Sequence, residues 1–387
     1  MAKETTKKTG VKKSSSRNPD SSKRSASSGS ASPSSRKKGA AKKKAAKKRK
    51  RFIIFGVEIL LLLVLVAGFY VVRQLDRLQR PKVDPEKVQI NENIPEETVK
   101  TMSGYTNVAL FGLDTRTPGQ LGKGNRSDTM IIASINNDTG EVRLVSVYRD
   151  TYLDLTNGKF NKCNGAYSAG GPEQAMGMLN KNLDLDIQYY MSVDFAALTE
   201  TIDLLGGIYI DVDESEISHL NNYTVETSKV TGVETQKLTQ TGLQLLDGVQ
   251  ATSYCRIRYT AGDDFKRTER QREVIMEIVN TAKKSDIAKI NEIINAVFSK
   301  IATNYSNEQL IQMAPEMIGY DIVDTQGFPF DKVPASIKAK GSCVVPVNLA
   351  ENVRQLHEYL FGNYDYVPSE EVQAISDQIM KDTGVTE

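Results

Sequence analysis

Three stretches of the chain are mostly apolar and have the length of sheet strands: residues 108–113, 129–135 and 142–147. The first two are apolar at successive positions, which predicts strands that are buried on both faces. Residues 136–140, between the second and third stretches, have the residue types of a hairpin turn. The pattern therefore predicts a buried sheet that starts near Asn107.

Helical spacing alternates with strands farther along the chain. Asp194 can cap a helix with apolar residues at helical spacing up to Leu205, and the glycine pair 206–207 ends it. A strand is predicted next, and then further helices: the strand at 208–212, and helices from about 172, over 267–284, around 290–301 and over 348–361. Helices and strands without strict βαβ alternation predict an α/β (mixed α+β) fold. Its central, mostly mixed β-sheet is flanked by helices on both faces.

One apolar run differs from the others, because residues 52–72 contain a single charge, Glu58. Its length suits a helix that crosses about 30 Å of hydrocarbon. The Lys/Arg-rich segment before it places the N-terminus in the cytoplasm and the rest of the chain outside. That segment is too long for a signal peptide, and no small-residue cleavage site follows the run. The sequence therefore predicts an uncleaved, single-pass anchor in the cell membrane.

The charge of the chain changes sign at this anchor. Residues 1–51 hold 19 Lys and Arg against two acidic residues, whereas the remainder holds 31 Lys and Arg against 46 acidic residues. A basic segment with so few large apolar residues is expected to be disordered. It suits anionic membrane lipids, at roughly 1 kcal/mol per charge near the surface. Nucleic acid is an alternative partner for this tail, but the adjoining anchor favours membrane lipids, and no nucleic acid is expected as a partner.

Composition sets the remaining boundaries. Residues 73–104 are charged, contain three prolines and are interpreted as a juxtamembrane linker with one short helix. Residues 105–365 are expected to form the extracytoplasmic domain, and residues 366–387 a loose polar tail. Three scattered cysteines form neither a disulfide framework nor a zinc pattern.

Asp and Arg gather where the predicted strands begin and end: Asp114, Arg116, Arg126, Asp128 and Arg149. Many guanidinium groups with few carboxylates fit a diphosphate, because arginine offers a planar fork of donors to phosphate oxygens. One or two carboxylates suit Mg²⁺, which completes its shell with phosphate oxygens and water. Surface Asp and Arg also pair commonly without any function. The residues alone therefore predict no more than a phosphate-binding outer domain.

A second group of charged residues follows in the later part of the domain. Arg256 and Arg258 alternate along a segment that we expect to be extended, and so share one face. Arg267 and Gln271 are four residues apart on a predicted helix and share a face there. The chain has only two histidines and no glycine-rich phosphate loop, so Asp and Arg are expected to carry the chemistry.

These residues lie in short motifs whose order resembles the LytR-CpsA-Psr family. The motifs are Gly112-Leu-Asp-Thr-Arg116, Arg126-Ser-Asp-Thr-Met130, Arg149-Asp-Thr151, Val193-Asp-Phe195, Leu205-Gly-Gly-Ile208, Arg256-Ile-Arg258 and Asp264-Phe-Lys-Arg-Thr-Glu-Arg-Gln271. The resemblance covers about residues 105–285, and residues 344–357 resemble the family's C-terminal extension. It implies a membrane-anchored phosphotransferase. Such an enzyme moves a glycopolymer from undecaprenyl pyrophosphate to peptidoglycan through a phosphodiester bond.

The resemblance also implies roles for single residues. Asp114 and Asp128 would hold Mg²⁺, with Mn²⁺ as the alternative. Asp114 would in addition orient or deprotonate the attacking hydroxyl, and which of these it does stays open. The diphosphate would be bound by several side chains, with Arg116 at the rim: Arg126, Arg149, Arg256, Arg258, Arg267 and Gln271. Asp114, Arg256 and Arg258 are the implied catalytic residues, and the apolar space between sheet and helices would take the polyprenyl chain.

Two alternatives belong to other functional classes. A transcriptional attenuator that binds DNA would need its working domain in the cytoplasm. A non-catalytic wall-binding protein of the same fold would be expected to have lost part of the Asp/Arg set, which is complete here. Departures from the family's motifs at Tyr148, Cys163, Tyr259 and Lys266 leave the preferred glycopolymer and acceptor open.

Overall fold

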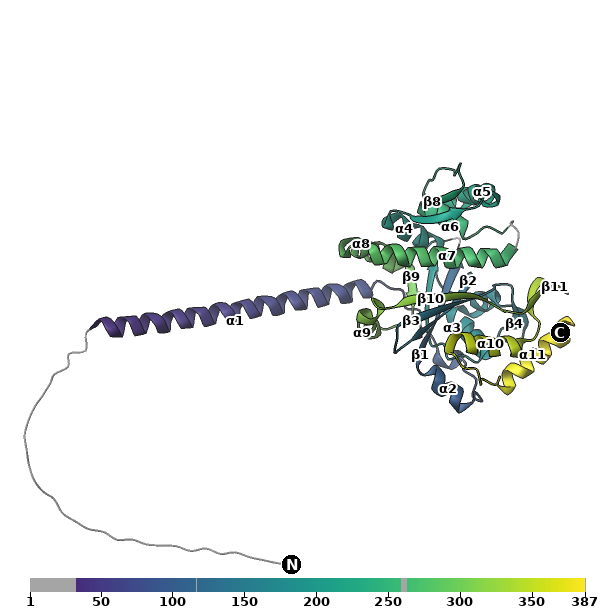
Figure 1. The fold of residues 1–387 in the computed structure, drawn as a ribbon, viewed down its shortest axis with the longest axis horizontal. Coiled ribbons are helices and arrows are strands. Elements are labelled where there is room, and N and C mark those ends of the chain that lie inside the picture. Colours follow the sequence, from purple (N-terminus) through teal and green to yellow (C-terminus); the bar gives the residue numbers. More distant parts are fainter. Residues whose placement is uncertain (1–32, 116, 259–262, 387) are drawn as a thin grey trace, which may run out of the picture. The chain divides into compact units, whose positions relative to one another are not determined.

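The computed structural model describes residues 33–115, 117–258 and 263–386 (Figure 1). The chain forms two compact units, one ending at Ala67 and the other beginning at Gly68. The description below takes each unit by itself.

The first unit consists, in its described part, of the long helix α1 (Pro33–Leu75), which continues into the second unit. Within it, Lys43–Leu75 is long and apolar enough to cross a membrane. The side chains of residues 52–72 are exposed, as those of a lipid-facing helix would be. Residues 33–51 are helical, so the prediction of disorder is wrong there, because Ala, Lys and Arg favour helix. The rest of the basic tail lies outside the described residues.

A six-stranded sheet with the order β10-β3-β2-β1-β6-β9 is the centre of the second unit. Strand β2 is antiparallel to β1 and β3, β6 is parallel to β1, β10 is parallel to β3, and β9 is antiparallel to β6. The strands are β1 (Tyr105–Asp114), β2 (Arg126–Asn136), β3 (Glu141–Val147), β6 (Tyr189–Asp194), β9 (Ile301–Thr303) and β10 (Asp321–Phe328). The predicted mixed sheet is confirmed, and its first three strands are those the apolar stretches predict.

Helices cover both faces of this sheet (Figure 1). Phe111, Met130 and Val145 point to one face and pack with one group of helices: α3 (Asn164–Leu183), α10 (Leu349–Phe361) and α11 (Glu370–Thr383). Ile131 and Leu144 point to the other face, as alternation along a strand requires. The helices on that face are α7 (Asp263–Lys284) and α9 (Asn307–Met317).

A third apolar cluster joins a hairpin and three helices to α7. Its buried members include Ile202, Ile210, Leu246 and Val274. The elements are α4 (Phe195–Leu205), β7 (Ile208–Val212), α5 (Glu214–Thr231), β8 (Gly242–Leu246) and α6 (Gly248–Tyr254). The predicted cap of α4 is confirmed, because the Asp194 carboxylate accepts a 2.8 Å hydrogen bond from the Ala197 amide. Gly206 ends the same helix, as the sequence predicts.

Residues 73–104 follow a fixed path on the second unit. Gln79 bridges to Ala302, and its side-chain amide donates 2.9 Å hydrogen bonds to the carbonyl oxygens of Gly119 and Ser299. The segment contains η1 (Pro85–Lys87) and α2 (Glu96–Met102). Met102 is buried in the main core, so the predicted linker contributes packing as well as reach.

The C-terminal residues contradict the prediction of a loose tail. Helix α11 packs Val372, Ile375 and Ile379 into the main core. These residues are spaced three and four apart, which is helical spacing within an otherwise polar stretch. Ser369 caps the helix by accepting a hydrogen bond from the Val372 amide.

The remaining elements connect these layers. They are β4 (Tyr152–Asp154), β5 (Phe160–Lys162), α8 (Ile287–Val297), η2 (Phe298–Lys300), β11 (Lys332–Ile337) and β12 (Gly341–Pro346). The three cysteines are buried and free, in keeping with the absence of a disulfide framework in the sequence.

Candidate active site

The hairpin of β1 and β2 brings two carboxylates to one end of the sheet. Asp114 ends β1 and pairs in register with Arg126, which begins β2, and the register shifts just after Gly112. A Cβ atom at Gly112 would lie 2.8 Å from the Cβ atom of Thr129, so only glycine lets the strands approach this closely here. As a result Asp114 and Asp128 both line one cavity.

Asp128 is the centre of a cluster of guanidinium groups. Arg149 donates a 2.9 Å hydrogen bond to its carboxylate, and Arg258 lies 3.6 Å from the other carboxylate oxygen. Arg267 donates a 2.7 Å hydrogen bond to its backbone carbonyl oxygen. These arginines come from the end of β3, the segment after α6 and the first turns of α7, so the fold gathers charges that are far apart in sequence.

Asp264 is a second carboxylate in this cluster, and the sequence analysis does not assign it a role. It lies 3.3 Å from Arg267, 3.6 Å from Arg149 and 3.9 Å from Arg258. Its place three residues before Arg267 at the start of a helix is the signal that could have identified it. Asp264 and Asp128 together hold three arginines side by side.

Burial changes the pKa values of two of these arginines. The Arg267 side chain is only 2% exposed, and this burial lowers its pKa to about 10 despite the nearby Asp264 carboxylate. Burial acts in the same direction on Arg149, but the carboxylates of Asp128, Asp150 and Asp264 outweigh it and raise its pKa. An anion beside Arg267 would therefore offset an unfavourable desolvation.

Several buried polar atoms of the cluster have no hydrogen-bond partner among the described residues. They are Arg149 Nε, Asp264 Oδ2, Arg267 Nε and Gln271 Oε1. Buried polar atoms usually are satisfied, and exceptions concentrate at binding sites. The two Nε atoms that make no hydrogen bond are donors of the kind that phosphate oxygens accept.

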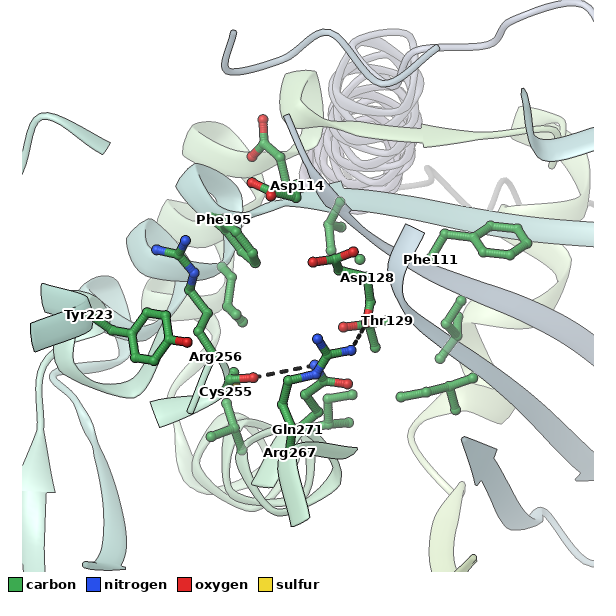
Figure 2. A pocket seen from close by; sticks show the side chains of 18 of the residues that line it. Phe111, Asp114, Asp128, Thr129, Phe195, Tyr223, Cys255, Arg256, Arg267 and Gln271 are labelled. Atoms are coloured by element: carbon green, nitrogen blue, oxygen red, sulfur yellow. Dashed lines mark hydrogen bonds between the residues drawn. The ribbon is translucent and has the colours of Figure 1, made fainter. Parts of the chain in front are cut away.

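Arg256 belongs to a different part of the cavity wall. Its guanidinium group lies between the rings of Phe195 and Tyr223, 5.0 and 5.3 Å from their centroids. It donates hydrogen bonds of 2.8 Å to Glu226 and 3.0 Å to Thr227, both on α5. Figure 2 shows Arg256 across the cavity from Asp128 and Arg267.

The backbone around these two arginines also differs from the sequence prediction. Arg256 lies in the turn that follows α6 and Arg258 in the irregular segment after it, not in the extended stretch that we predict, because the helix runs up to Tyr254. A turn does not place alternate side chains on one face. Arg258 therefore joins the guanidinium cluster, whereas Arg256 contacts α4 and α5.

The cavity has a volume of about 450 Å³, and its wall combines charged and apolar side chains. Asp128 and Arg267 lie on one side and Arg256 on the other, and the rest of the wall comes from both the sheet and the helices (Figure 2). Its apolar lining includes Leu110, Phe111, Ile131, Met191, Val193, Phe195, Leu198, Val274 and Ile275. Such a space fits a ligand with an anionic head and a hydrocarbon tail.

The structure brings most of the predicted site residues together. Six of them line the cavity: Asp114, Asp128, Arg256, Arg258, Arg267 and Gln271. Arg149 joins them through its contact with Asp128, whereas Arg126 is exposed at the start of β2. Gln271 donates a 3.3 Å hydrogen bond to the carbonyl oxygen of Cys255. Arg116 lies outside the described residues.

The donor set is compatible with a hard divalent cation. Asp114 and Asp128 supply carboxylate oxygens to one cavity, and Mg²⁺ commonly takes one or two protein carboxylates with phosphate oxygens and water. Among the described residues, no group of three or more His, Cys, Asp or Glu side chains could hold a metal ion by itself. Any cation here would depend on ligands from the substrate.

Comparison with known proteins places the chain in a family. The profile of the LytR_cpsA_psr family matches residues 76–353, which include every element of the cavity. The chain belongs to the LytR-CpsA-Psr family. This agrees with the resemblance that its motifs indicate.

Individual relatives of the LytR-CpsA-Psr family support the assignment. The chain is 33% identical over 270 residues to the polyisoprenyl-teichoic acid–peptidoglycan teichoic acid transferase TagU of Enterococcus faecalis, covering 68% of this chain and 81% of that protein. The TagU of Oceanobacillus iheyensis is 28% identical over 272 residues, with 66% and 77% covered. A crystal structure of a Streptococcus agalactiae protein has the same fold, with a TM-score of 0.57, 22% identity, and 72% and 93% of the two chains covered.

Proposed function

We propose that this chain is a membrane-anchored transferase that moves a glycopolymer from an undecaprenyl-pyrophosphate carrier to peptidoglycan. The observation that carries the proposal is one cavity whose wall combines several guanidinium groups with a large apolar lining. The names of the TagU relatives, which are teichoic acid transferases acting on peptidoglycan, support the same reaction class. Wall teichoic acid is one glycopolymer that this chemistry would accept.

The reaction replaces a phosphoanhydride bond of the carrier by a phosphodiester bond to the acceptor. The acceptor hydroxyl attacks the phosphorus atom that carries the glycopolymer, and a new P–O bond forms. The P–O bond to the bridging oxygen breaks, and undecaprenyl phosphate leaves. Positioning and charge neutralisation provide most of the acceleration in such transfers.

The described residues suit these tasks. Arg149, Arg258 and Arg267 already lie side by side, so they need little rearrangement to neutralise a diphosphate. Asp114 would accept the proton of the attacking hydroxyl. We further propose that Asp114 and Asp128 hold Mg²⁺, or Mn²⁺ in its place, which would neutralise phosphate charge when bound.

The anchor determines where this chemistry would take place. We propose that α1 crosses the cell membrane once, with the basic tail in the cytoplasm against anionic lipids and the second unit outside. Protease added to intact cells should then remove the second unit and spare the tail. Protection of the second unit would favour a cytoplasmic role instead.

Arg258→Ala provides the direct test. Transfer from a lipid-linked teichoic acid to peptidoglycan should fall at least a hundredfold, because Arg258 contacts both carboxylates that organise the cluster. Lys289→Ala is the control, since Lys289 pairs with Glu292 on the surface of α8, outside both pockets. Equal transfer by wild type and Arg258→Ala would refute the proposed charge mechanism.

A further inference from the structure

A second pocket lies on the opposite face of the sheet from the cavity described above. Its volume is about 470 Å³, and it opens beside β3, β10 and α10. Arg143 of β3 shows which face this is. Its neighbours Val142 and Leu144 point into the apolar cluster beneath α7 and α9, so Arg143 points to the other face. The lining comprises Arg143, Asp324, Phe330, Gln355, Glu358, Tyr359, Gly362 and Tyr364.

Tyr364, the most exposed of the aromatic residues that line this pocket, is held in a defined place. Tyr364 is 72% exposed. The chain before it is fixed by the end of α10, where Gly362 adopts a left-handed conformation with φ 64°. The chain after it is fixed by Tyr366, whose hydroxyl donates a 2.5 Å hydrogen bond to Asp184 and whose ring stacks on His357 at 3.8 Å. An exposed ring on an anchored loop is a preorganised contact surface.

Polar groups of both hydrogen-bonding types lie beside this ring. Arg143 and Asp324 are register partners on neighbouring strands, so a donor and an acceptor sit next to each other. Gln355 and Glu358 are on α10 and add an amide and a carboxylate. The Tyr359 hydroxyl lies beside the Asp324 carboxylate, and burial together with this carboxylate raises the pKa of Tyr359.

The charge of the pocket discriminates between ligand classes. Asp324 and Glu358 accompany the cation Arg143 in the lining, and Glu358 also pairs with Arg354 at 3.2 Å. The lining thus has no excess of cations to attract a phosphate-rich polymer, in contrast to the guanidinium cluster of the other cavity. An uncharged ligand rich in hydroxyl and amide groups could instead use donors and acceptors together, with one flat face against Tyr364.

We propose that this pocket binds an uncharged saccharide chain. Given the proposed function, on which this identification rests, the ligand is the N-acetylated glycan strand of peptidoglycan. The pocket thus holds the acceptor polymer at a second point, away from the transfer reaction. A second contact of this kind raises the local concentration of acceptor without taking part in the chemistry.

Binding of a soluble N-acetylglucosamine oligosaccharide to the full chain in detergent tests the proposal, measured by titration calorimetry. Tyr364→Ala should weaken binding about tenfold, because it removes the stacking surface. Tyr359→Phe removes only a hydroxyl and should weaken it about threefold. Tyr209→Ala is the control, since Tyr209 is also exposed, at 58%, but lies on β7 outside the pocket.

The outcomes separate this inference from the proposed function. Weakened saccharide binding by both pocket variants, with transfer to a short soluble acceptor unchanged, supports the second site. Equal binding by wild type and both variants overturns it and leaves the transferase proposal standing. Competition by inorganic pyrophosphate at the same residues would also overturn it, because it would make the pocket an anion site.

Discussion

Arg256 and Arg258 are two positions apart, yet they contact different groups. Arg258 lies near Asp128 and Asp264, whereas Arg256 is bound by Glu226 and two aromatic rings. The carboxylate of Glu226 also lines the cavity, where it would repel an incoming diphosphate. Arg256 thus reaches the substrate only in competition with Glu226.

Glu226→Gln should therefore tighten the binding of inorganic pyrophosphate about fivefold. The change removes one negative charge from the cavity wall and frees the charge of Arg256 for the anion. Titration calorimetry on the full chain in detergent would measure the effect, with Glu358→Gln as the control on the other face of the sheet. Weaker binding by Glu226→Gln would instead make Glu226 a group that holds Arg256 in its productive position.

The ends of helices and the positions of strands are predictable wherever one residue or one apolar stretch determines the backbone. Asp194 begins α4 and Gly206 ends it, as predicted, and the three apolar stretches form β1, β2 and β3. The path around Arg256 and Arg258 was not predictable, because alternating charges do not distinguish a strand from the turn after a helix. Helix α11 was missed although Val372, Ile375 and Ile379 had helical spacing, since its polar residues outnumber them. Which arginines share Asp264 depends on tertiary packing alone.

The apolar lining of the cavity leads to a separate prediction, which concerns a residue of α4. Leu198 lines the cavity and is only partly buried, so Leu198→Trp would fill the space with little strain in the core. The amount of added undecaprenyl phosphate that the full chain in detergent retains should fall at least fivefold by mass spectrometry, whereas pyrophosphate affinity should change less than twofold. Val225→Trp, at an exposed position of α5, is the control. Unchanged lipid content would place the hydrocarbon chain elsewhere.

In the whole molecule, the C-terminal residues pack into the main core and do not form a loose tail. Asp184, buried at the end of α3, accepts hydrogen bonds from Asn91, Tyr366 and Ser369. His357 stacks on Tyr366, and its Nε2 atom lies 2.9 Å from the carbonyl oxygen of Leu183. One buried cluster therefore joins the segment before β1, the end of α3, α10 and the start of α11.

This cluster predicts a pH dependence of stability. Burial lowers the pKa of His357 to about 4, below its ordinary value of 6.5. The folded state thus binds fewer protons than the unfolded state between these values, so stability is lost as the pH falls from 6.5 towards 4. The free energy of unfolding should fall by about 2 kcal/mol between pH 7 and pH 5 through this residue. Denaturant unfolding of wild type and His357→Gln at both pH values measures it, and equal losses in the two proteins would contradict it.

Helix α7 carries Arg267 and Gln271 near its start, and Val274 and Ile275 one to two turns later. A rise of 1.5 Å per residue puts about 12 Å between Arg267 and Ile275 on one stiff rod. On the proposed function, this part of α7 would contact the diphosphate through Arg267 and the first isoprene units through Ile275. A nucleotide sugar has a similar diphosphate but no hydrocarbon at that distance, so it would make only the contact with Arg267. Selection of the lipid-linked donor would then be built into a single secondary-structure element.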